Sequence, residues 1–527
     1  MLDDKLKALW ARISPPQKAA FFGCFLSGYL VHLYVFTNII PNSDGLSRIF
    51  DPQQMTVSGR WFLHFASYFN GFTQMPAVIG LFSVLFLALA AALAVSLLGI
   101  RSRALSALSG ALMAAFPAVG YTFLYLFTAS AYCFAIFLAV LSVSLARRGR
   151  WHWLAGCLLL ACSMGTYQAY VTVAIGLSLL VIFRETLDPS ASFSATLRLG
   201  VRLMLFLAAG AVLYYGILLV FLQVKDLELL SYLGMDAASS GYPFGQLPRL
   251  ILDSLLPPPR AAAGHLQAGG GFLLPARFRQ HLHLRLDGRA GSGRAGAGRG
   301  LLPAVHGAGG ALAGALAPPG RAGHAGPTPP GHQLRPDPQP LVRPHPPDEI
   351  RVCAGASVLR RRAAPCAALW LVLLLLFSLN TNNRLYTASA QAHRATLSYA
   401  TRLASRIESC PGYTHGMPVY LIGSFPTDRV HNSVEGFAQV DHYSVPLDTV
   451  APLNKHIYYY LRDWLNLPIE EPAEADLMAM AERPEFAAMP RYPDDGSVQI
   501  IDGCLVVKVQ EEYTPKSDFE IAYENRR

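Results

Sequence analysis

The chain has 527 residues, of which 52% are hydrophobic and only 15% charged, with a mean hydropathy of +0.32. Soluble domains carry a charged fraction near one quarter, so this composition excludes an ordinary soluble enzyme and predicts an α-helical protein that crosses a membrane several times. The net charge of +9 is concentrated in residues 257–365, which sum to +10. Because no basic domain carries that charge, we expect no nucleic-acid partner.

The N-terminal half reads as a membrane bundle. Residues 1–18 hold four cations and no small-residue cleavage site, which favours a cytoplasmic segment over a removable signal peptide. About 20 apolar residues cross the hydrocarbon layer, and on that measure residues 1–256 predict about seven spans. One span each is expected at 19–40, 76–100 and 199–222, and two each at 104–146, with a break near Tyr121, and at 151–183.

Arginines and lysines sort to alternate ends of these spans. The N-terminus and the segments 101–103, 147–150 and 184–202 carry cations, whereas the intervening loops hold few. The positive-inside rule therefore places the loop 41–75, the Gly165–Tyr170 turn and residues 223–256 outside the cytoplasm. In a bacterium this corresponds to an inner-membrane protein whose polar loops face the periplasm.

The external loop that follows the first span is the expected catalytic segment. Within residues 39–65, IIPNSDGLSRIFDPQQMTVSGRWFLHF, it collects the acid Asp44, the cations Arg48 and Arg60, and Trp61. Asn-Ser-Asp-Gly is also a plain turn or helix-cap sequence. Trp61 and Phe62 are equally typical of an aromatic anchor at the membrane interface.

Residues 257–365 differ abruptly from both flanks. Of these 109 residues, 70 are Ala, Gly, Pro or Arg, and there are 14 Arg but no Lys. Such a composition is what a GC-rich gene gives when it is read in a wrong frame, so we favour a pair of compensating frameshifts over a genuine low-complexity linker. Resequencing of the gene decides between the two. No functional role is assigned to residues of this segment.

A last span and a small α/β domain close the chain. Residues 366–380 hold the last apolar run, and an even number of crossings between 256 and 380 would place residues 381–527 outside the cytoplasm. Residues 397–407 have helical apolar spacing, MPVYLIGS predicts a buried strand, and SVQIIDGCLVVKVQ predicts a hairpin that turns at Asp502-Gly503. Residues 458–464, YYYLRDW, predict an amphipathic helix on this domain or on the membrane surface.

Two cysteines lie in the terminal domain. Cys410 and Cys504 form a disulfide if the domain is in an oxidising compartment, and two unlinked thiols are the equal alternative. Outside residues 257–365 no CxxC or His-rich metal spacing occurs.

Several short motifs in order resemble one family. The NSDG loop, GRWF (59–62), GTYQAY (165–170), NNRLY (382–386) and the terminal YPDDGSVQIIDGCLVVKV are together similar to the type II O-antigen glucosyltransferases, the serotype-converting membrane enzymes of bacteria. The resemblance covers residues 1–256 and 367–527. The chain departs from the family in 257–365, where further spans and loops would stand, so part of the bundle is missing from this literal sequence and its product is expected to be inactive.

The resemblance implies a GT-C-like multispan enzyme. It would transfer glucose from undecaprenyl-phosphate glucose to O-antigen, lipopolysaccharide or a related glycan at the periplasmic face. Asp44 would act as the general base, and Arg48 and Arg60 would hold the donor phosphate. Trp61 is a further candidate substrate-binding residue. Whether the enzyme requires a divalent metal is left open.

Tyr167, Gln168 and Tyr170 are candidate sugar ligands, since aromatic rings and amides suit polyols; an aromatic belt at a tight turn is the alternative. Tyr232, Asp236 and Tyr242 are weaker candidates on the loop 223–256. A transporter or lipid-linked sugar flippase is the rival function, but the apolar spans contain almost none of the ionisable residues that mark a transport pathway.

Overall fold

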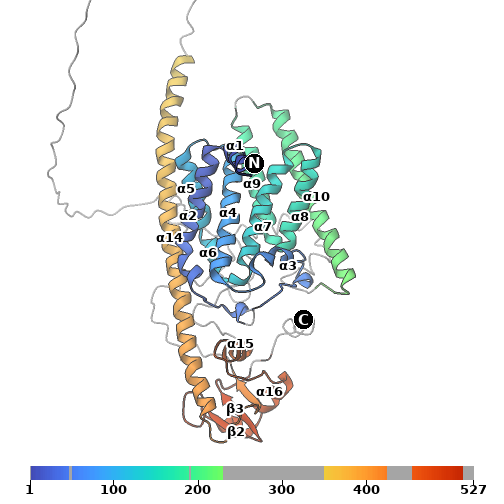
Figure 1. Ribbon diagram of the computed structural model, residues 1–527, viewed down its shortest axis with the longest axis vertical. Coiled ribbons are helices and arrows are strands. Elements are labelled where there is room, and N and C mark those ends of the chain that lie inside the picture. The colour runs from blue at the N-terminus through green and yellow to red at the C-terminus, as the bar shows by residue number, and fades with distance from the viewer. Residues whose placement is uncertain are drawn as a thin grey trace, which may run out of the picture. The chain divides into compact units, whose positions relative to one another are not determined.

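The computed structural model describes residues 2–46, 50–188, 191–229, 349–423, 454–513 and 515. Its helices and strands are drawn in Figure 1. The long helices are α1 (Leu2–Arg12), α2 (Pro15–Thr37), α4 (Pro76–Leu98), α5 (Arg103–Ala115), α6 (Pro117–Leu124), α7 (Leu126–Ala146), α8 (Arg150–Thr166), α9 (Val171–Thr186), α10 (Phe193–Val224) and α14 (Glu349–Glu408).

Within the described ranges, seven segments are long and apolar enough to cross a membrane. Six of them lie in the N-terminal half: α2, α4, α5 with α6, α7, the 3-10 turn η4 (Gln168–Tyr170) with α9, and α10; the seventh is residues 364–408 of α14. The remaining predicted span, α8, is a 17-residue helix that packs against α7 and α10. The predicted fold class, a polytopic helical membrane protein with a small C-terminal α/β region, is confirmed.

Local sequence signals explain where these helices begin and end. Ser14 caps α2 in a capping box with Gln17, and Ser102 and Ser192 cap α5 and α10. Proline occupies the first turn of α2, α4 and α6, where its missing N–H costs nothing. The break predicted near Tyr121 falls instead at Phe116 and Tyr125, on either side of the short α6.

Two glycines let α2 and α5 approach closely. A Cβ at Gly23 would lie 2.3 Å from the carbonyl oxygen of Ala107, and a Cβ at Gly110 would lie 2.2 Å from that of Ala20. Small residues at such crossings allow backbone-to-backbone packing, which is the main attraction available between helices in lipid.

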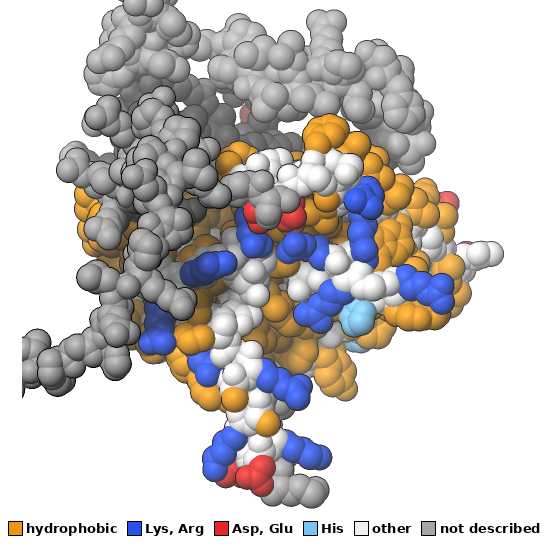
Figure 2. Space-filling view, turned by 90° about the horizontal axis from the view of Figure 1, so that it is seen from above, with side chains coloured by type: hydrophobic (Ala, Val, Ile, Leu, Met, Phe, Trp, Pro, Cys, Tyr) orange, Lys and Arg blue, Asp and Glu red, His pale blue; other side chains and the backbone are white. Residues whose placement is uncertain are grey.

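The cations predicted to share one side do lie at one end of the bundle. Arg184, in the last turn of α9, donates from Nη1 to the carbonyl of Leu97 at the end of α4. Arg202, near the start of α10, donates from Nε to Ala146 at the end of α7. Seen along the helices, Lys and Arg side chains gather on this face (Figure 2). The alternation of cations along the sequence thus corresponds to one end of the helix bundle that carries Lys and Arg side chains and to an opposite end at which the described residues include few.

The helix α14 contacts both the bundle and the terminal domain. Asn382 donates from Nδ2 to the carbonyl of Ala115 at 2.6 Å, and the Tyr386 hydroxyl lies 2.6 Å from Nδ1 of His32, a buried histidine of α2. Further along, Ala400, Leu403 and Ile407 are fully buried in the core of the terminal domain. The NNRLY motif therefore fixes α14 to the bundle, and the predicted domain boundary at 380 falls inside one continuous helix.

The terminal domain contains a three-stranded sheet of order β1-β3-β2. Strand β1 (Val419–Ile422) pairs in parallel with β3 (Cys504–Lys508), which pairs antiparallel with β2 (Val498–Ile501). The predicted strand and the hairpin turning at Asp502-Gly503 are both confirmed. Helix α15 (Asn454–Tyr459) continues as a π-helical turn, η8 (Tyr460–Trp464), and helices α16 (Glu474–Ala481) and α17 (Pro484–Ala488) complete the domain. The YYYLRDW segment buries Tyr458, Tyr460 and Leu461 in this core.

Of the two alternatives for Cys410 and Cys504, a disulfide or two unlinked thiols, the structure has two free thiols. Cys410 lies beside Val498, the first residue of β2, with Sγ 3.9 Å from its carbonyl oxygen. Cys504 pairs with Ile501 at the other end of that strand. Three residues of extended strand separate the two positions by about 10 Å, which exceeds the Cα separation that a disulfide spans.

Candidate functional site

The predicted catalytic acid lies on a short, firmly held turn. Asn42 precedes the 3-10 turn η1 (Ser43–Gly45), and its Oδ1 accepts a hydrogen bond from the Gly45 N–H at 2.7 Å. Gln74 donates from Nε2 to the Gly45 carbonyl at 2.8 Å. Asn42 and Gly45 are buried, whereas Asp44 between them is exposed. The turn thus presents one carboxylate to solvent on an anchored backbone.

The next residue ties this turn to the terminal domain. Leu46 has no exposed surface and belongs to the same buried cluster as Tyr399, Leu403 and Tyr460. The Trp464 indole N–H donates to the Leu46 carbonyl at 3.1 Å. The terminal domain therefore holds the backbone two residues beyond Asp44.

Arg60 follows a second turn of the same loop. The turn η2 (Thr56–Ser58) ends at Gly59 with φ +78°, a left-handed conformation that glycine adopts without steric cost. The Arg60 N–H then returns to the Met55 carbonyl at 3.1 Å and closes a short antiparallel bridge. This geometry directs the Arg60 side chain inward to the helix ends.

Four tyrosines from three other segments surround the Arg60 side chain. Its guanidinium carbon lies 4.7 Å from the ring centroid of Tyr167, and Nη1 donates to the Tyr132 hydroxyl at 3.4 Å. The Tyr132 and Tyr167 rings stack at 5.2 Å, and Tyr170 meets both edge to face. Tyr214 of α10 completes the set, because its hydroxyl donates to the carbonyl of Gly59, the residue before Arg60. We call these five residues the arginine–tyrosine cluster.

No acid among the described residues pairs with the cation of this cluster. Arg60 is half-buried and forms no ion pair with any residue that the structure describes, and its Nε is buried without a hydrogen-bond acceptor. A guanidinium removed from water without a counter-charge is costly. The cluster can therefore accept an anion, which the tyrosine hydroxyls can also hydrogen-bond.

Gln168 holds the cluster together from behind. Its Nε2 donates to the Ser58 carbonyl at 2.8 Å and to the Tyr214 hydroxyl at 3.1 Å, while the Tyr214 hydroxyl donates to the Gly59 carbonyl at 3.1 Å. Both amide hydrogens are thus used within the protein. Gln168 joins the loop to α9 and α10, and its carbonyl oxygen is the atom left for a ligand.

Trp61 is a packed side chain rather than an interfacial anchor. It is 6% exposed and stacks on Phe221 of α10 with centroids 5.7 Å apart. A Cβ at Gly165 would lie 2.5 Å from the Trp61 ring, and the Phe62 N–H donates to the Gly165 carbonyl at 2.7 Å. The first residue of the GTYQAY turn is therefore the surface against which the GRWF motif packs.

Asp44 and Arg60 lie over the same end of one helix. A Cβ at Gly45 would contact the Phe127 ring at 3.3 Å, and Arg60 contacts Tyr132. Both aromatics are in the first two turns of α7, separated by five residues and so by about 8 Å of rise. The carboxylate-bearing turn and the unpaired cation thus face a common region.

Of the predicted site residues, Arg60, Trp61, Tyr167, Gln168 and Tyr170 are brought together. Arg48 lies outside the described residues, as do Tyr232, Asp236 and Tyr242. Tyr132 and Tyr214 were missed, because each stands inside an apolar run where nothing in the sequence marks it as facing the loop. Among the described residues no three His, Cys, Asp or Glu side chains gather into a metal-binding group.

A family sequence model described as Glucosyl transferase GtrII matches residues 33–248. Over that region the chain is similar to the GtrII glucosyl transferase family. The predicted resemblance to the type II serotype-converting glucosyltransferases is confirmed. The match begins in α2 and includes the Asp44 turn, Arg60 and the four tyrosines of the cluster. No curated protein and no solved structure matches the chain.

The GtrII match and the apolar helices together support a membrane glucosyltransferase. In a GtrII enzyme the site must hold a sugar, an activated leaving group and an acceptor hydroxyl. The loop from Asn42 to Gln74 offers an exposed carboxylate and an unpaired cation for these tasks, both supported by buried hydrogen bonds.

Proposed function

We propose that this protein transfers glucose from polyprenyl-phosphate glucose, in bacteria undecaprenyl-phosphate glucose, to an O-antigen or related lipopolysaccharide glycan. The loop end of the bundle, with the arginine–tyrosine cluster, would face the periplasm of an inner-membrane protein, as would the terminal domain. The similarity to the GtrII family supports glucose as the sugar, and the anion-binding character of the arginine–tyrosine cluster supports a phosphate-linked donor.

The observation that carries this proposal is the unpaired Arg60. A donor of this class ends in a phosphate that carries negative charge both before and after transfer. The Arg60 guanidinium, with its buried Nε and free Nη2, offers a fork of N–H donors that matches phosphate oxygens. The Tyr132 hydroxyl and the Tyr167 ring keep that fork in one orientation.

Asp44 is assigned the role of general base, which removes the proton of the acceptor hydroxyl. The acceptor hydroxyl oxygen forms a bond to the anomeric carbon of glucose while its proton passes to the Asp44 carboxylate. The bond between the anomeric carbon and the phosphate oxygen breaks in the same step, and its electron pair leaves with the polyprenyl phosphate. Arg60 stabilises the charge that develops on that leaving group.

A glucose-transfer assay with Asp44→Asn tests the assignment. The asparagine keeps the size of the side chain but cannot accept a proton, so transfer from polyprenyl-phosphate glucose is expected to fall about a hundredfold or more. The assay uses the full chain and, beside it, the chain with its reading frame restored across 257–365.

Asp226→Asn is the matched control. Asp226 is an exposed carboxylate just beyond α10, near the end that carries Phe221 and the Trp61 contact, but it is not part of the loop. It should transfer glucose at the parent rate. Undiminished transfer by Asp44→Asn would remove that residue from the mechanism, and transfer from a nucleotide sugar instead of the lipid-linked donor would refute the donor class.

A further inference from the structure

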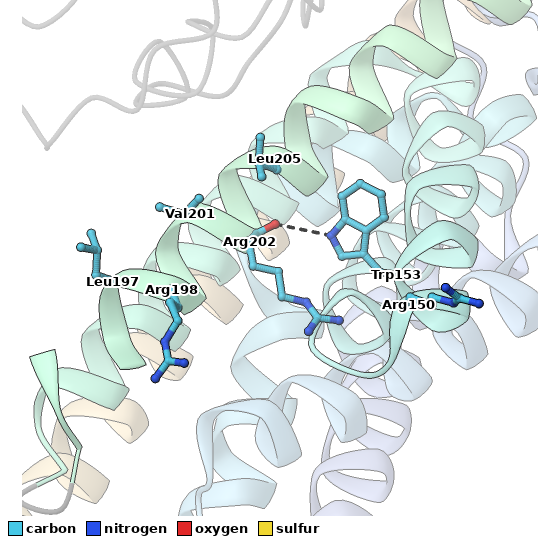
Figure 3. Close-up of a pocket in the computed structure, with 7 residues that line it drawn as sticks. All are labelled: Arg150, Trp153, Leu197, Arg198, Val201, Arg202 and Leu205. Atoms are coloured by element: carbon cyan, nitrogen blue, oxygen red, sulfur yellow. Dashed lines mark hydrogen bonds between the residues drawn. The ribbon is translucent and has the colours of Figure 1, made fainter. Parts of the chain in front are cut away.

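A second binding surface lies at the cation-bearing end of the bundle, away from the proposed site. A pocket of about 550 Å³ opens between α8 and α10, and Figure 3 shows its lining residues. The lining consists of three arginines, one tryptophan and three aliphatic side chains: Arg150, Arg198, Arg202, Trp153, Leu197, Val201 and Leu205.

The spacing on α10 separates this lining into two parallel stripes. Leu197, Val201 and Leu205 recur every four residues and so lie on one face of the helix, while Arg198 and Arg202 follow one position later on the adjacent face. Leu197 and Leu205 are 55% and 54% exposed. A row of cations therefore runs beside a row of apolar side chains that are each about half exposed.

One side of the pocket is rigid. The Trp153 indole N–H points to the Arg202 carbonyl at 3.5 Å, and Arg202 donates from Nε to the Ala146 carbonyl at 2.8 Å. These bonds hold α8 against α10 and leave both terminal nitrogens of Arg202 without a described partner. Arg150 and Arg198 are exposed, and none of the three arginines forms an ion pair within the described ranges.

We propose that this pocket binds the phosphate headgroup of an acidic phospholipid in the leaflet at the cation-bearing end. The arginine forks match a phosphodiester, the Trp153 indole suits the headgroup level, and the aliphatic stripe takes the upper acyl chain. Basic pockets between membrane helices are a recurring geometry for such lipids.

The apolar stripe favours a lipid headgroup over a free phosphate as the bound group. A free phosphate would engage the arginines but leave Leu197, Val201 and Leu205 in contact with water, whereas a lipid covers both stripes at once. The pocket is also distinct from the proposed donor site. Trp153 and Gly165 mark the two regions on α8, and twelve residues of helix separate them by about 18 Å.

Native mass spectrometry of the purified full chain in detergent tests the proposal without requiring glucose transfer. The probes are phosphatidylglycerol, zwitterionic phosphatidylcholine, inorganic phosphate and polyprenyl phosphate. Phosphatidylglycerol should be retained in preference to all three others. The double variant Arg150→Gln/Arg198→Gln should weaken that retention about 25-fold, since each cation near a membrane surface contributes about fivefold to acidic-lipid affinity.

Arg101→Gln/Arg103→Gln is the matched control, because it removes two exposed arginines from the same end but outside the pocket. It should bind phosphatidylglycerol like the parent. If both double variants lose phosphatidylglycerol retention equally, the lipid is attracted by the charge of the whole surface and not by the pocket. If neither variant loses retention, the proposed lipid site is rejected. Stronger retention of inorganic phosphate would assign a free anion, and stronger retention of polyprenyl phosphate would assign the donor lipid; either result overturns the proposal.

Discussion

Two buried or half-buried cations in different parts of this protein are treated in opposite ways. Lys508, in the terminal domain, is 2% exposed, yet its Nζ donates to the Ala487 carbonyl at 3.1 Å and pairs with Glu511 at 2.8 Å. Arg60, in the loop of the bundle, meets tyrosine rings and one hydroxyl and has no described acid.

The difference in counter-charge distinguishes a structural cation, Lys508, from a cation that can bind a ligand, Arg60. At Lys508 the protein itself supplies the counter-charge, so the pair needs nothing more. At Arg60 the described residues orient the guanidinium but supply no counter-charge. A bound anion would offset the electrostatic cost of half-burying that charge. The contrast can be tested at the loop, at the contact through which the terminal domain supports it, and within the terminal domain itself.

The largest effect is expected at Arg60. Arg60→Lys keeps the charge but replaces a planar fork, held on the Tyr167 ring, with a single ammonium that cannot form two parallel bonds to phosphate. Glucose transfer should fall about a hundredfold or more, the range found when one donor to a developing anion is removed. Steady-state kinetics with polyprenyl-phosphate glucose measure the change.

Arg101→Lys serves as the control for an exposed arginine at the opposite end and should transfer glucose normally. If Arg60→Lys also retains parental kinetics, Arg60 is a packing residue like Lys508, and the contrast between the two cations fails.

A smaller effect is expected where the terminal domain holds the catalytic turn. Leu46→Ala removes a fully buried side chain from the terminal-domain core and should cost about 3 kcal/mol in the stability of that contact. Because Leu46 lies two residues from Asp44, kcat should fall with little change in KM. Thermal unfolding followed by tryptophan fluorescence, together with kinetics, separates the two consequences.

Trp464→Phe is the companion change, since it removes the indole N–H that donates to the Leu46 carbonyl and keeps an aromatic ring at this position. It should lower kcat in the same direction as Leu46→Ala with a much smaller loss of stability, about 1 kcal/mol. A loss of stability in both variants with kcat unchanged would limit the terminal domain to a structural role.

How much of this the sequence predicts depends on the range of the interaction. The helices followed from the length of apolar runs, and the grouping of Arg60 with Tyr167 and Tyr170 followed from charge sorting, which needs only the order of cations along the chain. The hairpin at Asp502-Gly503 followed from local turn chemistry. Each of these signals lies within a few tens of residues.

Contacts between distant residues were not predictable in this way. The bond from Trp464 to Leu46 joins residues 418 positions apart. Tyr132 contacts Arg60, and Tyr214 contacts the neighbouring Gly59, only because of how the helices that carry them pack against one another. The choice between a disulfide and two free thiols was left open for a related reason. Whether Cys410 and Cys504 can meet depends on the register of β2, which holds them at opposite ends of that strand.

A third prediction probes hydrogen bonding inside the terminal domain. The buried Tyr458 hydroxyl donates to the Val419 carbonyl at 3.0 Å and accepts from the Leu421 N–H at 2.7 Å, and burial raises its pKa far above the ordinary value. Tyr458→Phe leaves both backbone groups of β1 unsatisfied and should destabilise the domain by about 2 kcal/mol. Chemical or thermal unfolding measures this.

Tyr413→Phe is the matched control. The Tyr413 hydroxyl is buried but has no hydrogen-bond partner among the described residues, so its removal should be neutral or slightly stabilising. Equal destabilisation by both variants would show that the hydroxyl of Tyr458 contributes nothing beyond the packing of its ring.

The smallest effect returns to the paired cation. Lys508 lowers the pKa of the Glu511 carboxyl by donating a hydrogen bond to it. A carboxyl whose pKa is lower in the folded than in the unfolded state adds stability above the unfolded pKa, about 4.3, and loses that contribution as the pH falls through the folded pKa. Glu511→Gln should therefore lower the unfolding temperature by a small amount at pH 7 and by a shrinking amount below pH 4. Glu511 is largely exposed, so salt should also reduce the difference. A deficit that is constant across this pH range would mean that Lys508 is held by the Ala487 carbonyl and the Phe486 ring alone, and that the acid partner does not distinguish it from Arg60.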